Sequence, residues 1–125
     1  MQYGRRMLAG IIVMACATLA AQQSRSSWSG VYTAQQAAAG EKIYVEKCAS
    51  CHGADLAGIE RAPALAGGVF ASAWHGQDLR RLLDRIDAMP PNAPGSLSAA
   101  DSVALLAFLL RTADMPGGAA PLPTD

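Results

Sequence analysis

The sequence predicts an all-α protein with one folded domain, and three observations lead to this expectation. The chain has 125 residues, which is the length of a single domain. Three of its segments place apolar residues at helical spacing. No segment alternates apolar and polar residues in the way that a half-buried strand does. The chain is also too apolar to be disordered, because 51% of its residues are hydrophobic and only 16% are charged.

Residues 1–20 are expected to be a secretory signal peptide. Arg5 and Arg6 precede an uncharged apolar run over 7–21, and small residues before position 21 offer a cleavage site. The run is shorter than the roughly 20 residues that span a bilayer. Two alternatives stay open, an uncleaved anchor and a lipoprotein acylated at Cys16. The two arginines also occur in twin-arginine export signals.

Removal of residues 1–20 makes the chain acidic. Ten Lys and Arg balance ten Asp and Glu in the whole sequence. The loss of Arg5 and Arg6 leaves 8 basic against 10 acidic residues, a net charge of −2. Such a chain lacks the basic surface of a nucleic-acid-binding protein, so no nucleic-acid partner is expected.

The rest of the chain divides into three parts. Residues 21–32 form a polar, Ser-rich leader that is expected to lie over the surface, held by Trp28 and Tyr32. Residues 33–114 form the domain. Residues 115–125 contain three prolines and two glycines and are expected to be a flexible, non-helical tail.

The three helices of the domain are predicted by caps and by periodicity. The first begins with a capping box of Thr33 and Gln36, and the third begins near Ser98 and runs to about residue 113. The second covers about 77–88, and Pro90-Pro91 stops it. Its apolar stripe consists of Leu79, Leu82, Leu83 and Ile86. Its Arg80, Arg81 and Arg85 are expected to form a solvated face, with a docking patch as the alternative.

The segment Cys48-Ala49-Ser50-Cys51-His52 has the spacing that attaches a c-type haem. The two thiols would add to the two vinyl groups of the porphyrin, so they must lie about one helical turn apart. The following imidazole then becomes the proximal iron ligand. Three alternatives are weaker: a zinc site that adds His75, a thioredoxin-like dithiol, and a plain disulfide.

Met89 is the expected distal iron ligand. It leaves the second helix on the apolar side, and the two prolines that follow stiffen its loop. A thioether is a soft ligand that suits ferrous iron. The alternatives are Met115 in the flexible tail, His75 in an expected loop with Trp74, and an open site.

With these residues in place, the chain resembles class I c-type cytochromes, the small soluble single-haem kind, from Thr33 to Ala113. The resemblance implies a cytochrome c fold, with three main helices and loops wrapped around one covalent haem c and its iron. It implies that Pro63 accepts the ring N–H of His52 through its carbonyl, and that Leu65 packs on the haem. The remaining matches are Gly40 and Tyr44 of the first helix, Leu105 and Phe108 of the last, Met89-Pro90, and, more loosely, Trp74 near the haem edge or a propionate.

The haem also explains why only 6% of the residues are aromatic, because the cofactor supplies the missing core volume. The leucines expected to cover its faces are Leu65, Leu79, Leu82, Leu83, Leu106 and Leu109.

The resemblance implies a periplasmic electron carrier and not an enzyme. With both axial positions filled by the protein, the iron has no place for a substrate. The expected partners are periplasmic redox proteins, such as a dehydrogenase donor and an oxidase acceptor. A membrane is involved only if Cys16 is lipidated or the leader is uncleaved. Two other hypotheses are a haem enzyme or gas sensor without the Met ligand, and a cytochrome subunit of a periplasmic dehydrogenase.

Overall fold

The computed structural model describes residues 25–125, and all its regular elements are helices. In this range the only bridge of the β type is an isolated one between Ile59 and Ala62, so the all-α prediction is confirmed. The signal peptide, Cys16 and the first residues of the leader lie outside the described range. The helices are a 3-10 turn at Ser27–Ser29, then α1 (Ala34–Lys47), α2 (Ala49–His52), α3 (Gly67–Trp74), α4 (Leu79–Asp87) and α5 (Ala99–Thr112).

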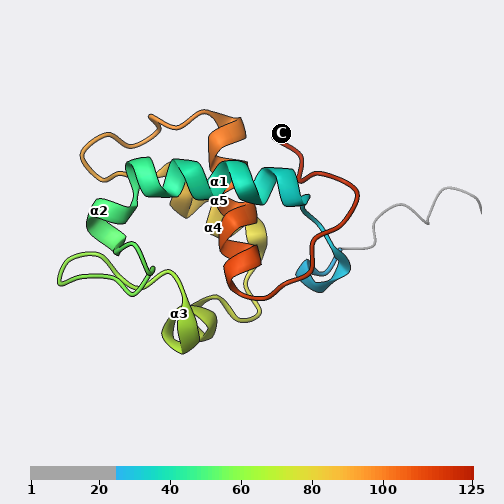
Figure 1. Ribbon diagram of the computed structural model, residues 1–125, viewed down its shortest axis with the longest axis horizontal. Helices are drawn as coiled ribbons and strands as arrows, with labels where there is room; N and C mark the ends of the chain where they lie inside the picture. Colours follow the sequence, from blue (N-terminus) through green and yellow to red (C-terminus); the bar gives the residue numbers. More distant parts are fainter. Residues whose placement is uncertain (1–24) are drawn as a thin grey trace, which may run out of the picture.

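The core forms where α5 crosses α1 at a steep angle (Figure 1). A Cβ atom at Gly40 would lie 1.9 Å from the carbonyl oxygen of Ala104, so glycine is what allows the two backbones to approach this closely. One turn further along, the rings of Tyr44 and Phe108 pack with their centroids 5.2 Å apart. Every residue of α5 from Ser102 to Leu110 is buried, which makes this helix the centre of the molecule.

The predicted helix boundaries hold at α1 and α5 and shift slightly at α4. Thr33 and Gln36 form the expected capping box, and the Ser98 side chain accepts from the amide of Asp101. The second helix begins at Leu79, two residues later than expected, because the Asp78 side chain caps it by accepting from the amide of Arg80.

Helix α3 was not expected from the sequence. It begins at a pair of glycines, Gly67-Gly68, with no side-chain cap. One buried aromatic residue, Phe70, attaches it to the core, and Phe70 also packs against Trp74 with the ring centroids 6.3 Å apart. Trp74 is therefore helical, whereas His75 and Gly76 lie in the turn after the helix, as expected. Trp74 is the last residue of a helix, and His75 is its C-cap.

The leader and the tail hold each other at the end of the molecule opposite α2 (Figure 1). The Tyr32 hydroxyl donates to the Met115 carbonyl at 2.6 Å, and the Gly118 amide donates to the Tyr32 carbonyl at 2.7 Å. Gln36 forms two hydrogen bonds of 2.9 Å with the backbone of Leu122. The tail is non-helical as expected. It is not a flexible end, however, because these hydrogen bonds hold it against Tyr32 and the first turn of α1.

Only one of the two aromatic residues expected to hold the leader does so. Tyr32 is 3% exposed, whereas Trp28 is 63% exposed. The anchor is the short segment of Val31 and Tyr32, which the tail covers. Trp28 precedes this anchor and stays on the surface.

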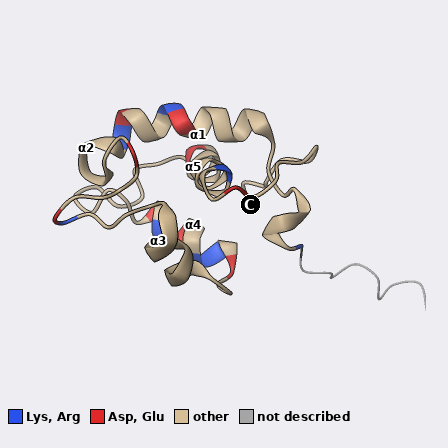
Figure 2. Cartoon of the chain, turned by 60° about the horizontal axis from the view of Figure 1, so that its bottom comes forward, with Lys and Arg blue, Asp and Glu red and all other residues tan. Residues whose placement is uncertain are grey.

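Charged residues of both signs lie close together along α1 and α4 (Figure 2). Arg80 pairs with Asp84 on the exposed side of α4 at 3.8 Å, and Arg111 of α5 reaches Glu41 of α1 at 2.6 Å. Within residues 25–125, no helix has both the length and the apolar character needed to cross a bilayer.

Candidate functional site

The two cysteines lie in one closed turn that continues directly from α1. Cys48 is the C-cap of α1 and the N-cap of α2 at once. The His52 amide donates to the Cys48 carbonyl at 2.9 Å, which closes the turn. Cys48 is half-buried, Cys51 is exposed, and both thiols are free, so the disulfide alternative is not what the structure contains.

The ring of His52 is oriented by the loop that follows it. Its Nδ1 atom lies 2.8 Å from the carbonyl oxygen of Pro63. A carbonyl oxygen only accepts, so this hydrogen bond requires the proton on Nδ1 and leaves the lone pair on Nε2. A histidine held in this way is ready to bind a metal through Nε2. The contact that the family resemblance implies is therefore present in the fold.

Backbone hydrogen bonds hold the Pro63 loop against the turn. The Gly58 amide donates to the His52 carbonyl at 2.8 Å, and the Leu65 amide donates to the Leu56 carbonyl at 2.8 Å. Leu56 is buried, and Leu65 is half-buried against the hydrophobic core. The position of the Pro63 carbonyl is thus set by the loop itself and not by the histidine alone.

Burial keeps two ionisable groups at the turn protonated. It raises the pKa of the Cys48 thiol, and it raises the pKa of Tyr44 to about 12, with Cys48 and Asp55 adding to the effect on Tyr44. Cys48 is therefore a neutral thiol at pH 7, and Tyr44 is a hydroxyl donor. The Tyr44 hydroxyl donates to the Gly53 carbonyl at 2.6 Å.

Met89 lies directly beyond the end of α4, on an element separate from the turn. Its amide donates to the Ile86 carbonyl at 2.9 Å, and its side chain is half-buried. The loop after it folds back, because the Gly95 amide donates to the Asp87 carbonyl at 2.8 Å. Met89 is thus held at the helix end by backbone contacts on both sides.

The other candidate ligands lie in different surroundings. His75 is exposed at the end of α3. Met115 is the first residue of the tail, where its side chain is half-buried against the core and its carbonyl accepts from Tyr32. In the described part of the chain, no three His, Cys, Asp or Glu side chains gather as a metal site. The zinc alternative, which needed His75 beside the two cysteines and His52, is therefore not formed.

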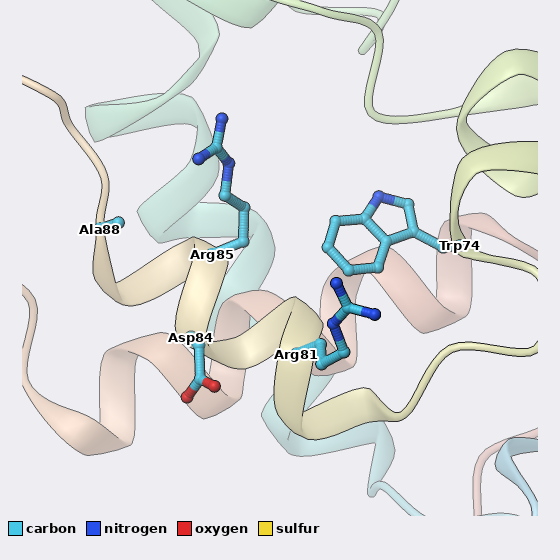
Figure 3. A pocket seen from close by; sticks show the side chains of 5 residues that line it. All are labelled: Trp74, Arg81, Asp84, Arg85 and Ala88. Carbon is cyan, nitrogen blue, oxygen red and sulfur yellow. The ribbon is translucent and has the colours of Figure 1, made fainter.

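A hollow of about 330 Å³ lies between Trp74, at the end of α3, and one face of α4 (Figure 3). Trp74 extends into it from α3, and the guanidinium groups of Arg81 and Arg85 extend toward the same space from α4. Arg80, which pairs with Asp84, does not line it. Asp84 and Ala88 line the hollow as well, so it offers two cations, one carboxylate and an indole N–H on the face of α4 that continues toward Met89.

Sequence reasoning missed two features of this region. Leu79 and Leu83, expected to cover a haem face, line a second hollow of about 250 Å³ together with Leu122 of the tail. The hydrogen bond from Tyr44 to Gly53 was also missed. The spacing of nine residues between them carried no signal, because the chain reverses direction at the turn.

Comparison with known proteins gives one family. The model of the family described as cytochrome c oxidase, cbb3-type, subunit III matches residues 35–109. The matched stretch runs from α1 to α5 and includes the cysteine turn, the Pro63 loop and Met89. No curated protein matches the chain.

A solved structure shares the fold. The crystal structure of the sulfane dehydrogenase SoxCD from Paracoccus pantotrophus contains a chain that is 24% identical, with a TM-score of 0.53. The match covers 78% of the present chain and 60% of the SoxCD chain. At this identity the likeness supports the arrangement of helices and no more.

Proposed function

Because the chain belongs to this family of c-type cytochrome domains, which carry electrons on a covalently bound haem c and its iron and are not enzymes, we propose that it is a periplasmic single-electron carrier with His52 and Met89 as axial ligands. The observation that carries the proposal is the hydrogen bond of 2.8 Å between His52 Nδ1 and the Pro63 carbonyl. It leaves Nε2 free at the end of a turn that also presents two free thiols.

The residues present fit a covalent haem. Cys48 and Cys51 are three positions apart on one helical turn, so both sulfurs reach the same edge of a flat ring. Apolar side chains that are only half-buried in the protein alone, such as Leu65, have surface left to cover it. When bound, the haem iron supplies the change between ferric and ferrous states.

Each residue of the site has a separate task. The two cysteines hold the cofactor so that it does not dissociate in either oxidation state. His52 donates its Nε2 lone pair, and Pro63 fixes the tautomer and the plane of the ring. Met89 would supply a neutral sulfur ligand to the iron, which favours the ferrous state and raises the potential.

The hollow between α3 and α4 suits the carboxylates of a haem. Arginine binds carboxylates through paired N–H groups, and an indole N–H adds one more donor. Arg81, Arg85 and Trp74 supply these groups from one space. Burying a haem edge there would leave its negative charges paired rather than exposed to an apolar surface.

One optical experiment tests the function. The purified protein should give the oxidised and reduced spectra of a c-type cytochrome, with a weak far-red band from sulfur-to-iron charge transfer in the oxidised form. Haem should stay with the polypeptide through acid-acetone extraction. Haem that is released by acid-acetone, or a ferrous protein that binds carbon monoxide readily, would count against this carrier.

The location and the partners are proposed from the export signal and the chemistry. A mature N-terminus near residue 21 in the periplasmic fraction supports export, whereas a diacylglycerol on Cys16 shows a membrane-held lipoprotein. A one-electron carrier needs a donor and an acceptor, and we expect a dehydrogenase and an oxidase. Gel filtration with candidate partners distinguishes a free carrier from a subunit.

A further inference from the structure

Tyr44 touches the haem-attachment turn at both of its ends. Its backbone carbonyl accepts the amide of Cys48 at 2.9 Å, where the turn begins. Its hydroxyl donates to the carbonyl of Gly53 at 2.6 Å, immediately after His52. We propose that Tyr44 is a positioning residue for the axial histidine, holding the Cys48–Gly53 segment from both ends and so setting where His52 meets the iron. The inference rests on the proposed role of His52.

Tyr44 is itself held firmly. Its side chain is 2% exposed, and its ring packs on Phe108 of α5. The two helix backbones approach closely at Gly40, one turn earlier, so the ring stands next to the tightest contact between α1 and α5. The hydroxyl is therefore a fixed point of the core rather than a mobile surface group, and the turn is tied to the central helix through it.

The Tyr44 hydroxyl gives the Gly53 carbonyl the shorter of its two hydrogen bonds, at 2.6 Å. The other donor to this carbonyl is the Leu56 amide, at a longer 3.2 Å. Besides its own helical hydrogen bonds, the segment from Cys48 to Gly53 is held by the Gly58 amide on the His52 carbonyl and by the His52 ring on the Pro63 carbonyl. Loss of the phenol oxygen thus frees one of the two ends while the packing of the ring is unchanged.

The orientation of the imidazole has two independent supports. Pro63 sets the rotation of the ring through Nδ1, and Tyr44 sets the backbone from which the ring extends. A Tyr44→Phe change removes the second support alone. Because the ring still packs on Phe108, the variant is expected to fold.

The chain offers a matched control. Tyr32 is also buried, at 3% exposure, and its hydroxyl also donates to a backbone carbonyl at 2.6 Å, that of Met115. It lies at the opposite end of the molecule, in the leader and tail (Figure 1). Tyr32→Phe deletes the same atom and the same kind of hydrogen bond without touching the turn.

The test compares the two holoproteins with the wild type by proton NMR of the oxidised state, in which the spread of the four haem-methyl shifts depends on the plane of the axial histidine. Tyr44→Phe should change this spread and shift the reduction potential, and Tyr32→Phe should leave both at the wild-type values. Amide exchange over 48–53 should become about tenfold faster in Tyr44→Phe alone, as the loss of one hydrogen bond predicts.

The outcome separates this inference from the proposed function. If the wild type has covalent haem and the far-red band, but Tyr44→Phe alters the haem-methyl shifts no more than Tyr32→Phe does, the positioning role is wrong and the carrier stands. If the wild type lacks covalent haem, both the carrier function and the positioning role of Tyr44 are wrong.

Discussion

Among single residues, Met89 decides whether the iron is closed to small ligands. Met89→Ala should erase the far-red band, open the ferrous iron to carbon monoxide, and lower the potential. The decrease is expected to be on the order of 0.1–0.3 V, within the roughly 0.8 V range over which axial ligands tune haem potentials. The measurement is an optical redox titration of the variant.

Met115→Ala is the control for Met89, because Met115 is half-buried at the start of the tail, where its carbonyl accepts from Tyr32. It should keep the band and the potential. If Met115→Ala loses the band and Met89→Ala keeps it, the ligand has been assigned to the wrong methionine. The carrier itself would survive that result.

Arg85 is expected to raise the potential through its charge. Arg85→Gln removes a cation from the hollow beside Trp74, so the ferric state should become more favourable. The shift should be on the order of 1 kcal/mol, the size of one charge acting across a partly solvated site, and it should shrink in high salt. Arg80→Gln is the comparison, because Arg80 does not line the hollow itself and touches it only through its partner Asp84. Equal shifts in the two variants would show that the hollow has no special role.

How far the site could be predicted differs from residue to residue. Cys48, Cys51 and His52 were found because their chemistry depends on local spacing along one turn. The contact between Tyr44 and Gly53 could not be found, since it depends on how far the chain turns back after the motif. The hollow between Trp74 and α4 was missed for a related reason. Trp74 and Arg85 line one space only because the end of α3 lies beside α4, and α3 was not predicted.

Among the helices, the contact between α1 and α5 is the most sensitive to a small change. Gly40→Ala would place a methyl group 1.9 Å from the Ala104 carbonyl oxygen, so one of the two helix backbones must shift. Destabilisation of about 1–3 kcal/mol, or more, is expected from such overpacking. Urea unfolding of the holoprotein measures it.

Gly68→Ala is the matched control for this change. Gly68 is also helical, and a Cβ atom there meets nothing within 4 Å. Replacing an exposed helical glycine by alanine should stabilise α3 by up to about 1 kcal/mol. If Gly40→Ala and Gly68→Ala lowered the free energy of unfolding equally, the close approach of α1 and α5 would not be the reason for glycine at position 40.

The helices that were predicted share a property that α3 lacks. The helices α1, α4 and α5 each begin with a side-chain cap. Helix α3 begins with two glycines and no cap, so propensity and capping both pointed away from it. Its single buried residue, Phe70, shows that tertiary packing stabilises it.

For the whole molecule, we expect the haem to be part of the core. Two Phe, two Trp and three Tyr are all the aromatic residues of the chain, and Trp28 among them is exposed. A variant with both Cys48→Ala and Cys51→Ala should retain no covalent haem, and its apo form should lose most of its helical signal in circular dichroism. A fully helical apo variant would show that the protein alone completes its core.

The contact between the leader and the tail determines on which side of the molecule a linker can be attached. Residues 25–32 and 115–125 are fastened together at one end, and α2 lies at the other (Figure 1). An electrode linker attached at Arg25 or at the tail would therefore leave from the side away from the cysteine turn (Figure 1). Immobilisation through either end should leave the same face of the protein open to the solution, and electron exchange with a dissolved redox dye should proceed at the same rate in both orientations.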